Sequence, residues 1–238
     1  MDLLKGWVPH LEDLRGMVLR VVLVWVVAAV ALFTWKDEVL TLLRMPLDVA
    51  RPHVILLTTG VTEQFAVYMK ISLWGGLLVV LPYVLWELWR FIHPALYQAE
   101  RRWVGGLMLV APLMGCLGLV FGWFVLLPPM LGFFLGFEAE GVEAMPRLGD
   151  YIGLLLSTLV AMAVAFNLPL VLIGLVQVGV LDVVSLRKAR RVVILGAFVA
   201  AAIITPTPDP FTMTLLAIPL WLLFEVALMV ATWLRSDH

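Results

Sequence analysis

Charged residues are scarce in this sequence. Its 238 residues include 16 Lys and Arg and 17 Asp and Glu, so only 14% are charged, while 63% are hydrophobic. Soluble domains carry about 25% charged residues. A chain with so little polar surface cannot cover its apolar side chains in water, which excludes a soluble monomer. The net charge of −1 provides no basic field that attracts nucleic acid.

Cysteine and catalytic motifs are also lacking. The single cysteine, Cys116, lies inside an apolar run, which excludes an internal disulfide and a cysteine-based metal site. The sequence contains no H-E-x-x-H, G-x-S-x-G or P-loop motif, and no dinucleotide-binding glycine motif. No two of its four histidines lie within one helical turn of each other. We therefore expect no catalytic, metal-binding or cofactor-binding residues, and a protein that is not an enzyme.

The sequence does contain long apolar runs. A helix that crosses a bilayer needs about 20 mostly apolar residues. The fifth of six such runs reaches only about 20 Å as a helix, and three prolines force a turn between it and the sixth. We predict an all-α polytopic membrane protein, one integral membrane domain over residues 1–238, with its last two helices short and forming a hairpin. The six predicted spans are 18–35, 65–86, 103–124, 151–176, 192–204 and 211–233.

The distribution of Lys and Arg predicts the orientation. The N-terminus, the second and fourth connections and the C-terminal tail together carry eleven of these residues, and the other connections carry four. Positive charge is retained on the cytoplasmic side of a membrane. We therefore expect a multi-pass protein of the cytoplasmic membrane with both termini in the cytoplasm.

Four polar residues lie within or beside the spans, where charged side chains cost about 2.5 to 3.5 kcal/mol each. Lys70 follows Glu63 by two helical turns, so both side chains point the same way near the outer surface. Lys70 is either a lysine whose ammonium group extends to the membrane surface or a residue with a role in function. Asn167 either forms a hydrogen bond that holds neighbouring helices together or has a role in function. Glu225 is expected to face inward as a carboxyl that can be protonated. Asp209 is expected to cap the sixth helix.

Small residues predict close helix packing in one place. Three glycine pairs match the G-x-x-x-G spacing, but such pairs arise readily in membrane sequences. Only Gly118 and Gly122 lie in a predicted span in a way that favours helix packing.

Acidic residues stand out on the cytoplasmic side. Asp13 precedes the first span, and Glu100 follows an aromatic, proline-containing segment after the second. Glu12 and Arg15 have the i, i+3 spacing of a local ion pair. Carboxylates at this edge are suited to hold the basic groups of a partner, because they accept bidentate hydrogen bonds from guanidinium groups.

Several blocks, taken in order, resemble the TatC family, the membrane subunit of the twin-arginine protein translocase. The six spans and inner termini agree with this resemblance, which covers nearly the whole chain. The blocks are His10-Leu11-Glu12-Asp13-Leu14-Arg15, Phe91-Ile92-His93-Pro94-Ala95-Leu96-Tyr97 with Glu100-Arg101, Phe166-Asn167-Leu168-Pro169, Gly196-Ala197-Phe198, Thr205-Pro206-Thr207-Pro208-Asp209, and Leu215-Leu216-Ala217-Ile218-Pro219 with Phe224-Glu225.

The resemblance implies a receptor for signal peptides that carry two consecutive arginines. It implies single-span TatA-type and TatB-type partners, self-association within the complex and contact with membrane lipid. It also implies the proton-motive force as the energy source, without ATP or a cofactor. The implied signal-peptide residues are Asp13, Arg15, Phe91, Pro94, Glu100 and Arg101, with Glu100 accepting the arginine pair. The implied partner-contact or transport residues are Asn167 and Asp209.

Two positions depart from the family pattern. The family usually has Glu where Asp13 stands, and often a basic residue where Met17 stands. It commonly has Glu in the middle of the fourth span, where this chain has Asn167, an amide that cannot titrate. We hypothesise that Glu225, at a similar depth, carries the proton instead.

Other readings of the sequence lead to different functions. A small-solute secondary transporter would also have about six helices and intramembrane charge, but the halves of this chain are unequal and no broken helix pair is evident. An intramembrane enzyme is disfavoured by the missing nucleophile and metal motifs. A purely structural scaffold is the remaining alternative.

Overall fold

The computed structural model describes residues 8–52, 54–92, 101–136, 145–204 and 209–236. This part of the chain is all-α, as predicted, and its only β feature is an isolated bridge between Leu57 and Arg147. The α-helices are α1 Val8–Thr34, α2 Lys36–Ala50, α3 Glu63–Lys70, α4 Gly76–Ile92, α5 Arg101–Phe121, α6 Leu127–Leu135, α7 Leu148–Ala165, α8 Leu168–Gln177, α9 Val183–Lys188, α10 Arg190–Ile204 and α11 Pro210–Ser236. Two π-helical segments, η1 Ile71–Gly75 and η3 Gly122–Leu126, join α3 to α4 and α5 to α6.

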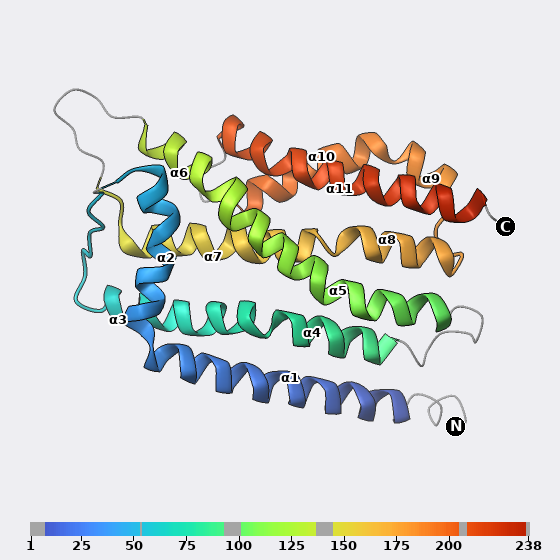
Figure 1. Cartoon of the computed structure of the whole chain (residues 1–238), viewed down its shortest axis with the longest axis horizontal. Helices are drawn as coiled ribbons and strands as arrows, with labels where there is room; N and C mark the ends of the chain where they lie inside the picture. Colours follow the sequence, from blue (N-terminus) through green and yellow to red (C-terminus); the bar gives the residue numbers. More distant parts are fainter. Residues whose placement is uncertain (1–7, 53, 93–100, 137–144, 205–208, 237–238) are drawn as a thin grey trace.

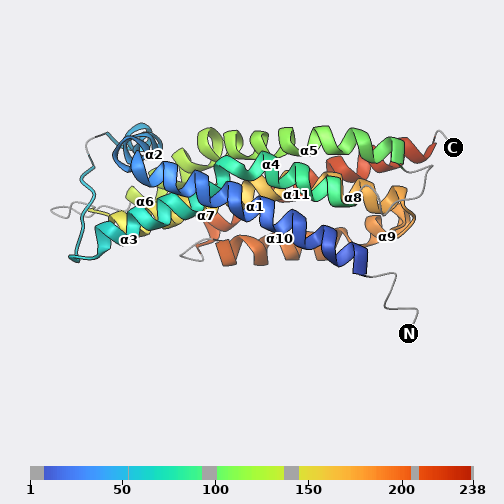
Figure 2. The same ribbon diagram turned by 90° about the horizontal axis from the view of Figure 1, so that it is seen from below.

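The long helices run side by side along the longest axis of the molecule (Figure 1). The start of α1 and the end of α11 lie at the same end of the bundle, together with the end of α4 and the start of α5. We call this the terminal end, and the end that carries α2 the opposite end. Helix α2 lies across the bundle in Figure 1 and is seen nearly end-on in Figure 2.

Each predicted span coincides with a helical stretch. Within the described residues, five stretches are long and apolar enough to cross a membrane by length and composition. Helix α10 coincides with the shortest of the predicted spans and is not among these five stretches. Its 15 residues agree with the prediction that the fifth span is short. The prediction that the sixth helix is also short is wrong, because α11 extends over 27 residues. The two helices pack against each other, which confirms the predicted hairpin.

Two features of the helices differ from the prediction. The connection after the first span contains α2, which buries Leu43 and Leu47 against the bundle although it is too polar to be a span. The fourth span, expected as an uninterrupted helix, is broken between α7 and α8. Pro169 explains the break, because a proline has no N–H to continue the helical ladder and its ring clashes with the carbonyl four residues earlier.

Glycines let neighbouring helices approach closely. An added Cβ at Gly76 would lie 3.1 Å from the Ala29 backbone, where α4 packs on α1. An added Cβ at Gly118 would lie 2.9 Å from the Met162 carbonyl carbon, where α5 crosses α7, and one at Gly122 would lie 3.2 Å from Leu159. The predicted packing role of Gly118 and Gly122 is confirmed.

Candidate functional site

A polar pocket of about 380 Å³ lies between α1 and α4 at the terminal end. The residues that line it recur every three or four positions on each helix, so they form one face of α1 and one face of α4. They are Glu12, Asp13, Gly16, Met17 and Arg20 from α1, and Glu87, Arg90 and Phe91 from α4.

Glu87 is the buried anion of this pocket. It is 3% exposed, and its carboxylate accepts hydrogen bonds from Arg20 Nη2 at 2.8 Å and Arg20 Nε at 3.4 Å. Arg90 Nη1 donates at 3.4 Å and the Tyr83 hydroxyl at 3.3 Å. A buried carboxylate is stable only when such partners replace water. The ion pair therefore ties α1 to α4 at this end of the bundle.

The pocket also contains two carboxylates that are not paired. Glu12 and Asp13 are exposed, and neither has a hydrogen-bond or ion-pair partner among the described residues. The local pair expected between Glu12 and Arg15 is not formed in this part of the chain. Neither carboxylate is thus neutralised by an ion pair within the described residues, although Arg20 and Arg90 line the same pocket.

The structure brings together two of the predicted signal-peptide residues. Asp13 and Phe91 line the same pocket, although they are 78 positions apart in the sequence. Arg15 does not line the pocket, because two positions along a helix turn a side chain by about 200° away from Asp13.

The other predicted residues of this group cannot be placed. Pro94 and Glu100 lie outside the described residues, and Arg101 begins α5 with a side chain that is not described.

Arg20 and Glu87 were not predicted as functional residues. A usable signal was present, because each is a charged residue at the edge of a long apolar run. Charged residues at such depth are unfavourable unless they are paired. The sequence alone did not show which cation meets which anion, because the partners are 67 positions apart.

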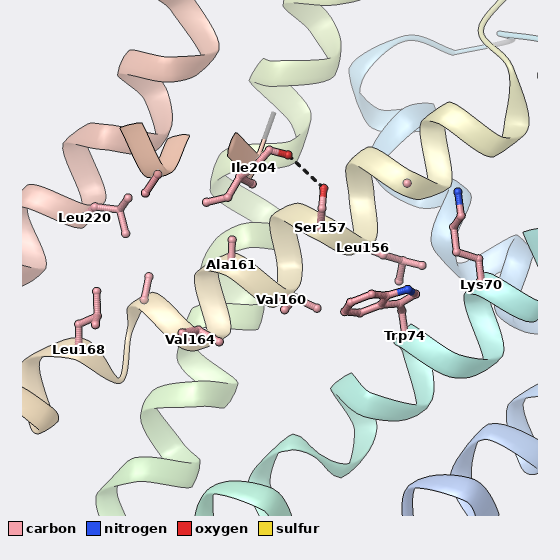
Figure 3. A pocket seen from close by; sticks show the side chains of 13 residues that line it. Lys70, Trp74, Leu156, Ser157, Val160, Ala161, Val164, Leu168, Ile204 and Leu220 are labelled. Atoms are coloured by element: carbon pink, nitrogen blue, oxygen red, sulfur yellow. Dashed lines mark hydrogen bonds between the residues drawn. The ribbon is translucent and has the colours of Figure 1, made fainter. Parts of the chain in front are cut away.

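Lys70 borders an apolar groove of about 570 Å³ on the side of the bundle (Figure 3). The groove is lined mainly by α7, with Trp74 beside Lys70, and with α10 and α11 across from them. The Ser157 hydroxyl points across the groove and donates to the Ile204 carbonyl at 3.5 Å. Lys70 is exposed and has no hydrogen-bond or ion-pair partner within the described ranges.

Asn167 lies at the break between α7 and α8 and is 8% exposed. Its backbone N–H bonds to Val164, so the Ala163 carbonyl loses its usual helical donor. The Asn167 side chain replaces that donor with a bond of 2.9 Å to the same carbonyl. The side-chain amide of Asn167 thus satisfies the carbonyl that the break in the helix leaves without a backbone donor. Its Oδ1 atom is buried without a hydrogen-bond partner among the described residues.

Glu225 forms an ion pair with Arg190. Its carboxylate accepts a hydrogen bond of 2.8 Å from Arg190 Nη2, at the start of α10. Its side chain is 20% exposed. The structure therefore shows an ion pair between α10 and α11, a partner for Glu225 that the sequence did not predict.

Asp209 caps α11, as predicted. One carboxylate oxygen accepts the Thr212 backbone N–H at 2.8 Å, and the other contacts the Thr212 hydroxyl. Pro210 occupies the first helical position, where a missing N–H is harmless.

The cap predicts a stability effect. Asp209→Ala is expected to lower the free energy of unfolding by about 1 kcal/mol, because the first turn of α11 loses its acceptor. Thermal unfolding of the purified protein in detergent measures the change. Asp209→Asn is the control, since its amide oxygen can still accept the Thr212 N–H. An Asp209→Ala variant as stable as the original chain would contradict the capping role.

Comparison with known proteins identifies the relatives of this chain. The profile of the family described as Sec-independent protein translocase protein (TatC) matches residues 9–219. The Sec-independent protein translocase protein TatC of Azotobacter chroococcum is 38% identical over 229 residues, which cover 96% of this chain and 89% of the relative. The protein of the same name from Deinococcus radiodurans is 36% identical over 230 residues, or 95% of this chain and 85% of the relative.

Solved structures match the whole fold. A crystal structure of the twin-arginine translocase receptor TatC superposes with a TM-score of 0.84 at 35% sequence identity, covering 94% of this chain and 98% of the other. A second crystal structure of that receptor, in the detergent DDM, has the same TM-score and identity and covers 93% and 99%.

Proposed function

The chain belongs to the TatC family of Sec-independent protein translocase proteins, and from that premise we propose that it is the receptor for twin-arginine signal peptides. It is a multi-pass membrane component of a translocase and not an enzyme. The receptor role means that the chain binds the paired arginines of a cargo protein before that folded protein crosses the membrane.

The observation that carries this proposal is the pair of carboxylates, Glu12 and Asp13, at the mouth of the α1–α4 pocket. Each can accept two parallel hydrogen bonds from a guanidinium group. Phe91 lines the same pocket, and an aromatic face is a favourable surface for a guanidinium plane to stack on. Carboxylates and an aromatic ring are the groups that favour a guanidinium group over an ammonium group, which supports arginine as the cation bound here.

The remaining parts of the proposal rest on the family and on the charge pattern. We place the chain in the cytoplasmic membrane with both termini in the cytoplasm, because Lys and Arg are concentrated in the connections of the terminal end. We propose TatA-type and TatB-type single-span partners, other copies of this chain and membrane lipid as its neighbours. Transport is proposed to draw on the proton-motive force.

A binding experiment tests the receptor role. The detergent-solubilised protein is expected to bind a fluorescent signal peptide with two arginines at least about tenfold more tightly than the same peptide with two lysines. An ammonium cannot reproduce the planar fork of the guanidinium group, and tenfold corresponds to about 1.4 kcal/mol. Fluorescence anisotropy measures both affinities. Equal affinity for the two peptides would contradict the proposal.

A further inference from the structure

The α1–α4 pocket contains cations of its own, close to the carboxylates proposed to receive the cargo. Arg20 and Arg90 line the pocket together with Glu12 and Asp13. Both arginines are half-exposed, with side chains 50% and 62% accessible. Each is therefore a potential competitor for the acceptors at the mouth.

Arg20 lies close enough to Asp13 to compete with a bound peptide for its carboxylate. An added Cβ at Gly16 would lie 3.4 Å from Arg20 Nη1, so the guanidinium group lies over the bare backbone at Gly16. Asp13 is one helical turn further, a rise of about 4.5 Å. An arginine side chain released from its present partner would reach the Asp13 carboxylate by rotation about its own bonds.

Glu87 prevents this movement in the structure. Its two oxygens hold Arg20 at 2.8 and 3.4 Å, and Oε1 also accepts Arg90 at 3.4 Å. Burial strengthens the hold, because a charge pair out of water is screened less than an exposed one. The Tyr83 hydroxyl, at 3.3 Å, fixes the carboxylate from the same helix.

We infer that Glu87 is a positioning residue for signal-peptide binding, which sequesters Arg20 and Arg90 so that Glu12 and Asp13 stay available to the arginines of the cargo. This inference rests on the proposed function. Glu87 does not touch the peptide; it acts by retaining the pocket's own guanidinium groups. The pocket thus contains two separate acidic positions, an inner one filled by the chain itself and an outer one left for the ligand.

The test compares Glu87→Gln with the double variant Arg20→Gln/Glu87→Gln. Glutamine has nearly the same shape as glutamate, so the substitution removes the charge with little change in packing. We expect Glu87→Gln to bind the twin-arginine peptide about tenfold more weakly, because Arg20 then competes for Asp13. The double variant is expected to bind more tightly than Glu87→Gln and to recover most of the lost affinity, because the competitor is gone. Asp37→Asn, at the opposite end, is the control for loss of one negative charge.

The rescue separates positioning from a structural role. If Glu87 merely supported the fold, removing Arg20 as well would weaken binding further or leave it unchanged, and the inference would be overturned. Unchanged affinity of Glu87→Gln would overturn it too, while leaving the receptor role intact. Failure of the unmodified protein to bind the peptide would overturn the receptor role itself and this inference with it. Size-exclusion profiles and thermal unfolding of each variant show whether it is folded.

Discussion

The variant Asp13→Asn/Glu100→Gln is expected to bind a twin-arginine signal peptide roughly 100-fold more weakly than the unmodified protein. Asp13 lies at the mouth of the α1–α4 pocket, and Glu100 is the arginine acceptor implied by the family resemblance. Removing one partner of a buried charge pair costs about 2 to 5 kcal/mol, and less at a wet rim. A loss of about 1.4 kcal/mol for each substitution adds up to about 2.7 kcal/mol, which is 100-fold. Fluorescence anisotropy with the detergent-solubilised protein measures the change.

A matched control removes the same charge elsewhere. Asp37→Asn/Glu38→Gln neutralises two exposed acidic residues of α2, at the opposite end of the bundle. It is expected to leave peptide affinity unchanged, because exposed charges further apart than the Debye length of about 8 Å are largely screened at physiological salt. If Asp13→Asn/Glu100→Gln bound as tightly as this control, the acidic site would not be the receptor for the arginine pair.

Gly118→Ala is expected to lower the free energy of unfolding by about 3 kcal/mol. The added methyl group would contact the Met162 carbonyl oxygen and lie 2.9 Å from its carbon and 3.0 Å from the Ala163 Cα. These are backbone atoms of α7, so no side chain can rotate away, and the two helices must separate. Overpacking of this kind costs about 1 to 3 kcal/mol. Thermal unfolding in detergent measures the loss.

Gly132→Ala provides the control for this substitution. It also replaces a helical glycine, in α6, but no atom lies within 4 Å of the added Cβ. Alanine is a better helix former than glycine by about 1 kcal/mol, so this variant is expected to be at least as stable as the original chain. An equal loss of stability in both variants would show that close packing at Gly118 is not the cause.

Much of the fold was predictable because membrane insertion depends on local sequence. Hydrophobic length located the six helical stretches, and the prolines between α10 and α11 predicted their hairpin. The cap at Asp209 was equally predictable, because its partner is only three positions away. The role of Gly118 was a weaker prediction, since the same spacing at Gly132 and Gly136 involves no neighbouring helix: Gly132 faces open space, and the atoms nearest Gly136 belong to its own α6.

The amino-acid sequence by itself determined that this chain lies in a membrane as a helical bundle, and it indicated that acidic residues at one end receive basic groups. Only the tertiary structure decided which charges remain available. Arg20 meets Glu87 and Arg190 meets Glu225 across 67 and 35 positions, and these pairs depend on how neighbouring helices approach and rotate. Hydropathy is a sum over adjacent residues and carries no information on that rotation, whereas an ion pair forms only when two side chains come within about 4 Å of each other.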